Sequence, residues 1–216
     1  MKHTLNDQER LRLNRSVADT EKRTGAQIAL AVIERCDAYS ELPWKAFALG
    51  AAMAGLFISA LDLLRPGWTS DTSVLLAVVM TLAAGAACAL LCVCLPGFAR
   101  LFLDAHRAEI EVRQYAETLF LSRELFATRR RSGVLLLIGL FERRVIVLPD
   151  TGLSQRLSPH ALQGINARMA GALALGKIAG ALEDGLDSLE EVLSVTAPVA
   201  PEENELPDEI IEEKGL

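Results

Sequence analysis

The chain has 216 residues and a formal net charge of −6, and 51% of its residues are hydrophobic while 5% are aromatic. This apolar fraction, with a mean hydropathy of +0.27, excludes a disordered polymer, a collagen-like fibre and a disulfide-stapled miniprotein. The acidic balance argues against a nucleic-acid-binding protein, so we expect no nucleic-acid partner. Residues 197–216 hold seven acids and one lysine and carry the whole net charge, whereas residues 1–196 are balanced.

Residues 4–40 predict a helix followed by a strand. Asn6 and Glu9 have the spacing of a capping box, which marks a helix start. The helix is expected to run to about Arg23 and to end at the Thr-Gly pair that follows, since glycine commonly terminates helices. Residues 27–34 (QIALAVIE) form a short apolar run with β-branched members, which predicts a buried strand.

Residues 44–99 contain two long apolar stretches. Residues 46–64 include one charge, Asp62, and residues 73–99 include none. About 20 apolar residues span the hydrocarbon core of a bilayer as a helix, so we predict a two-pass transmembrane hairpin with a turn at 65–72. The alternative is a pair of buried helices in a soluble protein, but a 27-residue uncharged run exceeds most core helices.

The distribution of positive charge predicts the orientation of this hairpin. Arg35 and Lys45 flank the first span, Arg100 and Arg107 follow the second, and the connecting turn holds only Arg65. Because positive residues prefer the cytoplasmic side, both arms are expected in the cytoplasm.

Residues 104–195 predict the second arm of the domain. Residues 104–128 have the pattern of a long amphipathic helix, and residues 133–140 and 144–148 predict a β-hairpin in the middle of a covered sheet. Ser158 followed by Pro159 predicts the start of another helix, and a final helix is expected from about Lys177.

These elements predict an α/β fold that is split by the membrane hairpin. Neither arm has enough strands for a stable sheet, so we expect one small sheet with helices on both faces, built from both arms. Two crossings return the chain to the side that it left, which makes this pairing possible. Residues 197–216 are expected to form a disordered acidic tail, with a partner-binding tail as the alternative.

Four segments resemble the TPM domain, the family of thylakoid lumen protein, Psb32 and MOLO-1. They are residues 20–28 (TEKRTGAQI), 131–137 (RSGVLLL), 142–147 (ERRVIV) and 151–153 (TGL). The resemblance covers about residues 4–195 and is greatest to a bacterial version in which a hydrophobic hairpin follows the first strand. It implies an α/β sandwich and an integral protein of the bacterial inner membrane. Family members include acid phosphatases, metal binders and assembly factors.

A phosphatase of this type would need a nucleophile or a metal-activated water, with positive groups around the phosphate. The candidate catalytic residue is Asp150, and the candidate anion contacts are Arg130, Arg131, Arg143 and Arg144. The guanidinium group of arginine can donate two parallel hydrogen bonds to phosphate oxygens. The alternative is that these residues form solvated turns.

The resemblance also implies a divalent cation, Ca²⁺ or Mg²⁺, as the possible cofactor. Asp150 and Glu21 are the candidate ligands. A lipid headgroup is an alternative ligand for the cluster at 129–131, because the domain is tethered to a membrane.

No recognised catalytic motif accompanies these residues. We therefore predict a membrane-anchored module that binds a membrane-protein partner or supports assembly, and a metal-dependent phosphatase is the alternative. The sequence leaves open whether the chain is an enzyme and whether it forms an oligomer.

Overall fold

The computed structural model describes residues 5–64, 71–194 and 210–215, with the backbone alone at 71 and 72. The chain divides into two compact units. Residues 1–37 and 108–216 form the unit that we call the α/β unit, and residues 38–107 form the hairpin unit.

The described chain contains both α-helices and β-strands. The α-helices are α1 (Asp7–Thr24), α2 (Glu41–Leu64), α3 (Asp71–Cys94), α4 (Pro96–Ala99), α5 (Ala105–Ser122), α6 (Pro159–Ala174) and α7 (Ile178–Ser194). Short 3₁₀ turns lie at Arg100–Phe102 and Thr151–Leu153. The strands are β1 (Gln27–Arg35), β2 (Gly133–Gly139), β3 (Arg144–Pro149) and β4 (Ile211–Gly215).

The first helix and strand follow the predicted signals. The backbone N–H of Asn6 donates to Glu9 Oε2 at 2.8 Å, as in a capping box. The helix ends at Thr24, and Gly25 has a φ of 69°, the left-handed conformation that glycine adopts without steric cost. The strand prediction is confirmed, with one residue added at its end.

The two arms share one sheet, as predicted. Its described strands have the order β3-β2-β1-β4. β1 pairs in parallel with β2, so that Gln27 lies opposite Gly133 and Ile33 opposite Gly139. β2 and β3 form the predicted antiparallel hairpin. The residues before and after the hairpin unit therefore belong to a single hydrogen-bonded structure.

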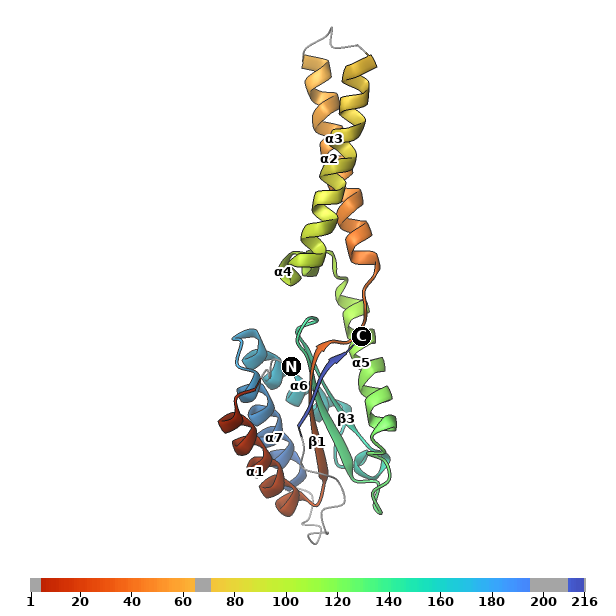
Figure 1. Cartoon of the computed structure of the whole chain (residues 1–216). Coiled ribbons are helices and arrows are strands. Elements are labelled where there is room, and N and C mark those ends of the chain that lie inside the picture. Colours follow the sequence, from red (N-terminus) through yellow and green to blue (C-terminus); the bar gives the residue numbers. More distant parts are fainter. Residues whose placement is uncertain (1–4, 65–70, 195–209, 216) are drawn as a thin grey trace. The chain divides into compact units, whose positions relative to one another are not determined.

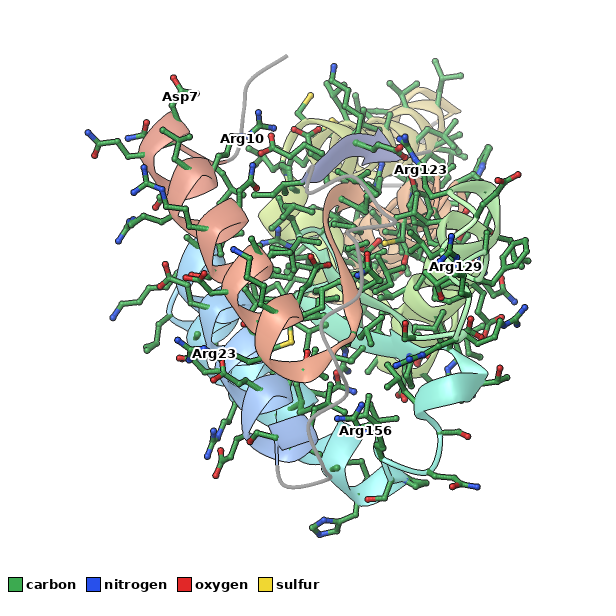
Figure 2. All side chains as sticks on the ribbon, turned by 90° about the horizontal axis from the view of Figure 1, so that it is seen from below. Asp7, Arg10, Arg23, Arg123, Arg129 and Arg156 are labelled. Carbon is green, nitrogen blue, oxygen red and sulfur yellow. The ribbon has the colours of Figure 1, made fainter. Side chains whose placement is uncertain are left out.

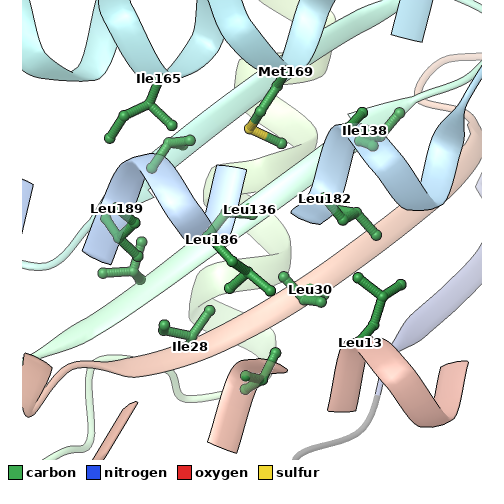
Figure 3. Close-up of a cluster of buried hydrophobic side chains, with 14 of the residues drawn as sticks. Leu13, Ile28, Leu30, Leu136, Ile138, Ile165, Met169, Leu182, Leu186 and Leu189 are labelled. Atoms are coloured by element: carbon green, nitrogen blue, oxygen red, sulfur yellow. The ribbon is translucent and has the colours of Figure 1, made fainter. Parts of the chain in front are cut away.

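Helices cover both faces of this sheet. In the α/β unit, α1 and α7 lie on one side and α5 on the other (Figure 1). Alternate strand residues face opposite sides. Leu30 and Leu136 join the core beneath α1, α6 and α7, where Leu186 and Met169 meet them (Figure 3). The adjacent residues, such as Leu135, join the core beneath α5.

The hairpin unit consists mainly of α2 packed against α3. Both are long and apolar enough to cross a membrane, with windows of mean hydropathy 1.9 and 2.5. Glycines allow their close approach: a Cβ added at Gly50 would lie 2.7 Å from Cys88 Sγ, and one at Gly85 would lie 2.9 Å from the Phe47 ring.

Two predicted helices end earlier than expected. The second apolar run was expected to be helical through residue 99, but α3 ends at Cys94 because Leu95 precedes Pro96 and becomes extended (φ −118°, ψ 100°). The amphipathic helix expected through residue 128 ends at Ser122, because Glu124 turns the chain with a φ of 51°. Most of the predicted turn at 65–72 lies outside the described residues.

Two further predictions, one about the β-hairpin and one about the tail, were wrong. The β-hairpin does not lie wholly in the middle, because β3 is an edge strand. The tail is not disordered throughout, because β4 pairs in parallel with β1. Its aliphatic start explains this: Ile210 is 6% exposed in one core, and Ile211 packs against the other. Residues 195–209 of the predicted tail lie outside the described part.

The packing of β2 predicts a cost for core truncation. Leu136 is fully buried at the centre of the sheet, so Leu136→Ala is expected to lower the free energy of unfolding by about 2–5 kcal/mol. Denaturant titration of the detergent-solubilised chain measures this value. Leu121→Ala is the control, since Leu121 is 63% exposed, and a shift beyond about 0.5 kcal/mol there would contradict the assignment of the core.

Candidate functional site

Asp150, the candidate catalytic residue, lies with Arg131 where two loops meet. Arg131 Nε is 2.9 Å from Asp150 Oδ2, and the Asp150 side chain is only 3% exposed. The N–H of Thr151 donates to Asp150 Oδ1 at 2.6 Å. Both carboxylate oxygens are therefore in contact with groups of the protein itself.

These two loops are also joined through their backbones. The N–H of Asp150 donates to the carbonyl of Gly133 at 2.8 Å, and the N–H of Gly152 donates to the carbonyl of Arg131 at 3.0 Å. A Cβ at residue 152 would collide with the carbonyl oxygen of Arg130. The Asp-Thr-Gly sequence is thus a tight join between the end of β3 and the start of β2, and its contacts favour a structural role for Asp150.

Glu21, the second candidate metal ligand, lies at the same end of the sheet. It is 8% exposed, and its Oε1 accepts the N–H of Ile28 at 2.7 Å. Nearby, the guanidinium of Arg156 donates to the carbonyls of Thr24 and Leu193. The sequence analysis did not find the role of Arg156, because carbonyls at helix ends have no residue-specific signature.

The candidate anion contacts fall into two groups. Arg130 and Arg131 precede β2, whereas Arg143 and Arg144 lie at the other end of the β-hairpin. The six residues of β3 separate Arg144 from Asp150 by roughly 20 Å at 3.3 Å per residue. The arginines therefore do not gather around Asp150.

The donor set does not fit a divalent cation. Among the described residues, no group of three His, Cys, Asp or Glu side chains is placed to hold a metal ion. One carboxylate oxygen of each candidate ligand, Asp150 Oδ1 and Glu21 Oε1, already accepts a backbone N–H. We derive no metal-dependent step from this arrangement.

The opposite end of the sheet holds a buried carboxylate that the sequence analysis treated as a turn residue. Glu142 is 6% exposed, and its Oε1 accepts the N–H of Cys36 at 2.9 Å. The turn also docks on the end of β1, since the N–H groups of Leu140 and Phe141 donate to the carbonyls of Ile33 and Glu34. Glu142 thus fixes the point where the chain leaves β1 for the hairpin unit.

A cavity of about 330 Å³ opens beside this point, and we call it the α5 cavity. It lies at the carboxyl end of β1, where ligands of parallel sheets commonly bind. Residues of β1, the segment after it, α5 and β4 line it: Cys36, Asp37, Glu111, Gln114, Tyr115, Thr118, Leu119, Ser122 and Glu213. Three of these residues are acids, and none is basic.

The two other titratable side chains of the α5 cavity stay neutral at physiological pH. Burial raises the pKa of the Cys36 thiol, and the negative charge of Glu142 raises it further. Burial likewise raises the pKa of Tyr115, and its hydroxyl donates to Glu213 Oε2 at 2.8 Å. The cavity therefore offers carboxylates, a phenol and an un-ionised thiol, which suits binding of a cation better than nucleophilic catalysis.

The raised pKa values predict a loss of stability at alkaline pH. Between the unfolded and folded pKa values the folded state holds more protons, so the free energy of unfolding falls as pH rises. The decline is expected to begin near pH ~8.5, where an unfolded thiol ionises. Denaturation midpoints from pH 7 to 10 test this, and Cys36→Ala is expected to lessen the decline. An equal decline in that variant would contradict the assignment.

The contacts between the two loops predict that loss of the Asp150 carboxylate destabilises the fold. Asp150→Ala leaves the Thr151 N–H without its carboxylate, so a loss of about 1–3 kcal/mol in the free energy of unfolding is expected. Arg144→Ala, at an exposed position, is the control and is expected to change it by less than about 0.5 kcal/mol. Equal stability of wild type and Asp150→Ala would argue that the residue is kept for another purpose.

Comparisons with known proteins agree with this architecture. The chain is similar to the NMR structure of BA42 protein from the psychrophilic bacterium Bizionia argentinensis, with a TM-score of 0.58 and 14% identity over 98% of this chain and 97% of that chain. At this identity the likeness shows the fold alone. A search of curated proteins found no match.

A family model matches the part of the chain that follows α4. The matched residues are 101–192, and the family is the TPM domain. This match confirms the predicted resemblance without distinguishing the Psb32 or MOLO-1 subtype. The matched residues supply α5, β2, β3, α6 and most of α7.

Proposed function

We propose that the chain is a membrane-anchored TPM-domain module that binds a partner protein at the bacterial inner membrane. The α5 cavity receives a positively charged group of that partner. The observation that carries this proposal is the acidic lining of the cavity beside the exit of β1. A lysine or arginine side chain is the protein group whose charge and length suit such a lining.

The exposure of the apolar helices supports the anchoring part of the proposal. Only 6% of the most apolar window of α2, and of α3, is buried in the chain. Large apolar side chains on both helices are exposed, including Leu56 at 69% and Leu75 at 67%. Core helices of a soluble protein would be covered, whereas a bilayer supplies an apolar solvent for such surfaces. The positive residues that flank the spans favour a cytoplasmic position for both arms.

Phosphatase activity is the weaker candidate function. The contacts of Asp150 with Arg131 and Thr151 account for both of its oxygens, and Arg143 lies at the other end of β3. We expect no turnover of a generic phosphomonoester with added Mg²⁺ or Ca²⁺ beyond that of a matched empty-vector preparation. Metal-dependent turnover that is lost in Asp150→Asn would favour the phosphatase instead.

Site-specific cross-linking tests partner binding. A photo-reactive amino acid at Gln114, which lines the α5 cavity, is expected to give a discrete cross-linked product in intact cells. Glu111→Gln in the same chain is expected to reduce that product several-fold, because it removes one of the acids. A photo-reactive residue at the exposed Gln163 of α6 is the control. A product of equal yield with and without Glu111→Gln would contradict the role of the cavity.

A further inference from the structure

β4 joins the sheet by contacts that reach both of its faces. Its parallel pairing with β1 places Ile211 opposite Ala31, Glu212 opposite Val32 and Glu213 opposite Ile33. Because strand side chains alternate, Glu212 faces α1 and Glu213 faces α5. The preceding Ile210 is 6% exposed and belongs to the core on the α1 side.

Each glutamate has a basic partner on the side of the sheet that it faces. Arg10 of α1 lies 3.0 Å from Glu212 Oε1, and the side chain of Glu212 is only 12% exposed. Arg123, just beyond α5, lies 2.9 Å from Glu213 Oε1, and Tyr115 donates to the other oxygen. Seen from below, Arg10 and Arg123 lie on either side of β4 (Figure 2). The strand is thus held by opposite charges from both layers of helices.

The end of β4 is also specified. Gly215 has a φ of +75°, and a Cβ there would collide with the carbonyl oxygen of Arg35. Only glycine suits this conformation and this approach. The edge of β1 therefore accepts a segment with two aliphatic residues, two glutamates and a glycine at fixed spacing. We call this edge, together with Arg10 and Arg123, the acceptor site.

We propose that the acceptor site also binds the same segment, residues 210–215, of a second copy of this chain. Fifteen residues, 195–209, separate the end of α7 from Ile210. At 3.3–3.6 Å per residue they span at most about 54 Å, which is enough for exchange between neighbouring copies. The side-chain contacts of β4 described above all join this segment to the acceptor site. The same contacts can therefore form within one copy or between two copies.

Mass action decides which form is present. The linker gives the cis segment a high effective concentration, so isolated copies keep their own β4. Confining copies to a membrane raises their mutual concentration, and the charge complementarity of Arg10 and Arg123 with the two glutamates selects this segment over other exposed strands. Reciprocal exchange makes a dimer without any new interface.

A charge-swap experiment on the full chain in detergent micelles tests the exchange. The first variant, Glu212→Arg with Glu213→Arg, has a reversed tail; the second, Arg10→Glu with Arg123→Glu, has a reversed acceptor site. In each variant the tail and the acceptor site of the same chain carry like charges and repel each other. Mixed with different affinity tags, the two are expected to co-purify at least about fivefold more than differently tagged copies of either variant alone. Absence of this excess would overturn the proposal.

Two controls separate failed exchange from failed folding. The variant with all four reversals restores the match within one chain, so its Tm is expected to recover toward wild type, and a Tm no higher than that of the two parents would overturn the acceptor site. A labelled peptide of residues 209–216 (EIIEEKGL) is expected to bind the reversed-tail variant at least about tenfold more tightly than the reversed-acceptor variant. Peptide binding without co-purification would show an acceptor for another acidic strand and would overturn exchange between copies.

Discussion

The parallel pairing of β1 with β2 is the contact on which the rest of this structure depends. β1 precedes the hairpin unit and β2 follows it, yet seven consecutive residues pair between them. Parallel strands need a long crossover connection, and here the hairpin unit and α5 supply it. If the two apolar helices span a bilayer, this pairing requires an even number of crossings. The sheet therefore restricts the number of membrane crossings, whereas the flanking charges indicate the side on which the arms lie.

The two ends of the sheet differ in chemistry. At the start of β1 and β2, the charged groups make structural contacts: Asp150 and Arg131 join two loops, and Glu21 accepts a strand N–H. At the carboxyl end of β1, three acids line the open α5 cavity. Glu213 connects this cavity with β4, since the same carboxylate lines the cavity and binds Tyr115 and Arg123. Occupancy of the acceptor site and the charge of the cavity are therefore coupled.

The sequence predicted most elements because their signals are local. The capping box at Asn6, the helix-ending Gly25 and the continuous apolar run of β2 each depend on neighbouring residues. The strand at 211–215 could not be predicted in this way: its acidic composition is typical of disorder, and its partners, which are β1, Arg10 and Arg123, are distant in sequence. The same limit applies to the site. Asp150 was identified as a candidate by its residue type, but only the three-dimensional arrangement shows that its carboxylate joins two loops.

Cross-linking of the two arms tests the split fold most directly. Arg23 of α1 and Glu190 of α7 form an ion pair at 2.8 Å, so cysteines at both positions are expected to be joined within one chain by a short bismaleimide. With a protease site placed at Gly67 between the apolar helices, the two fragments should stay linked after cleavage in native membranes. Fragments that separate although each single cysteine reacts with a maleimide would show that the arms do not form one sheet.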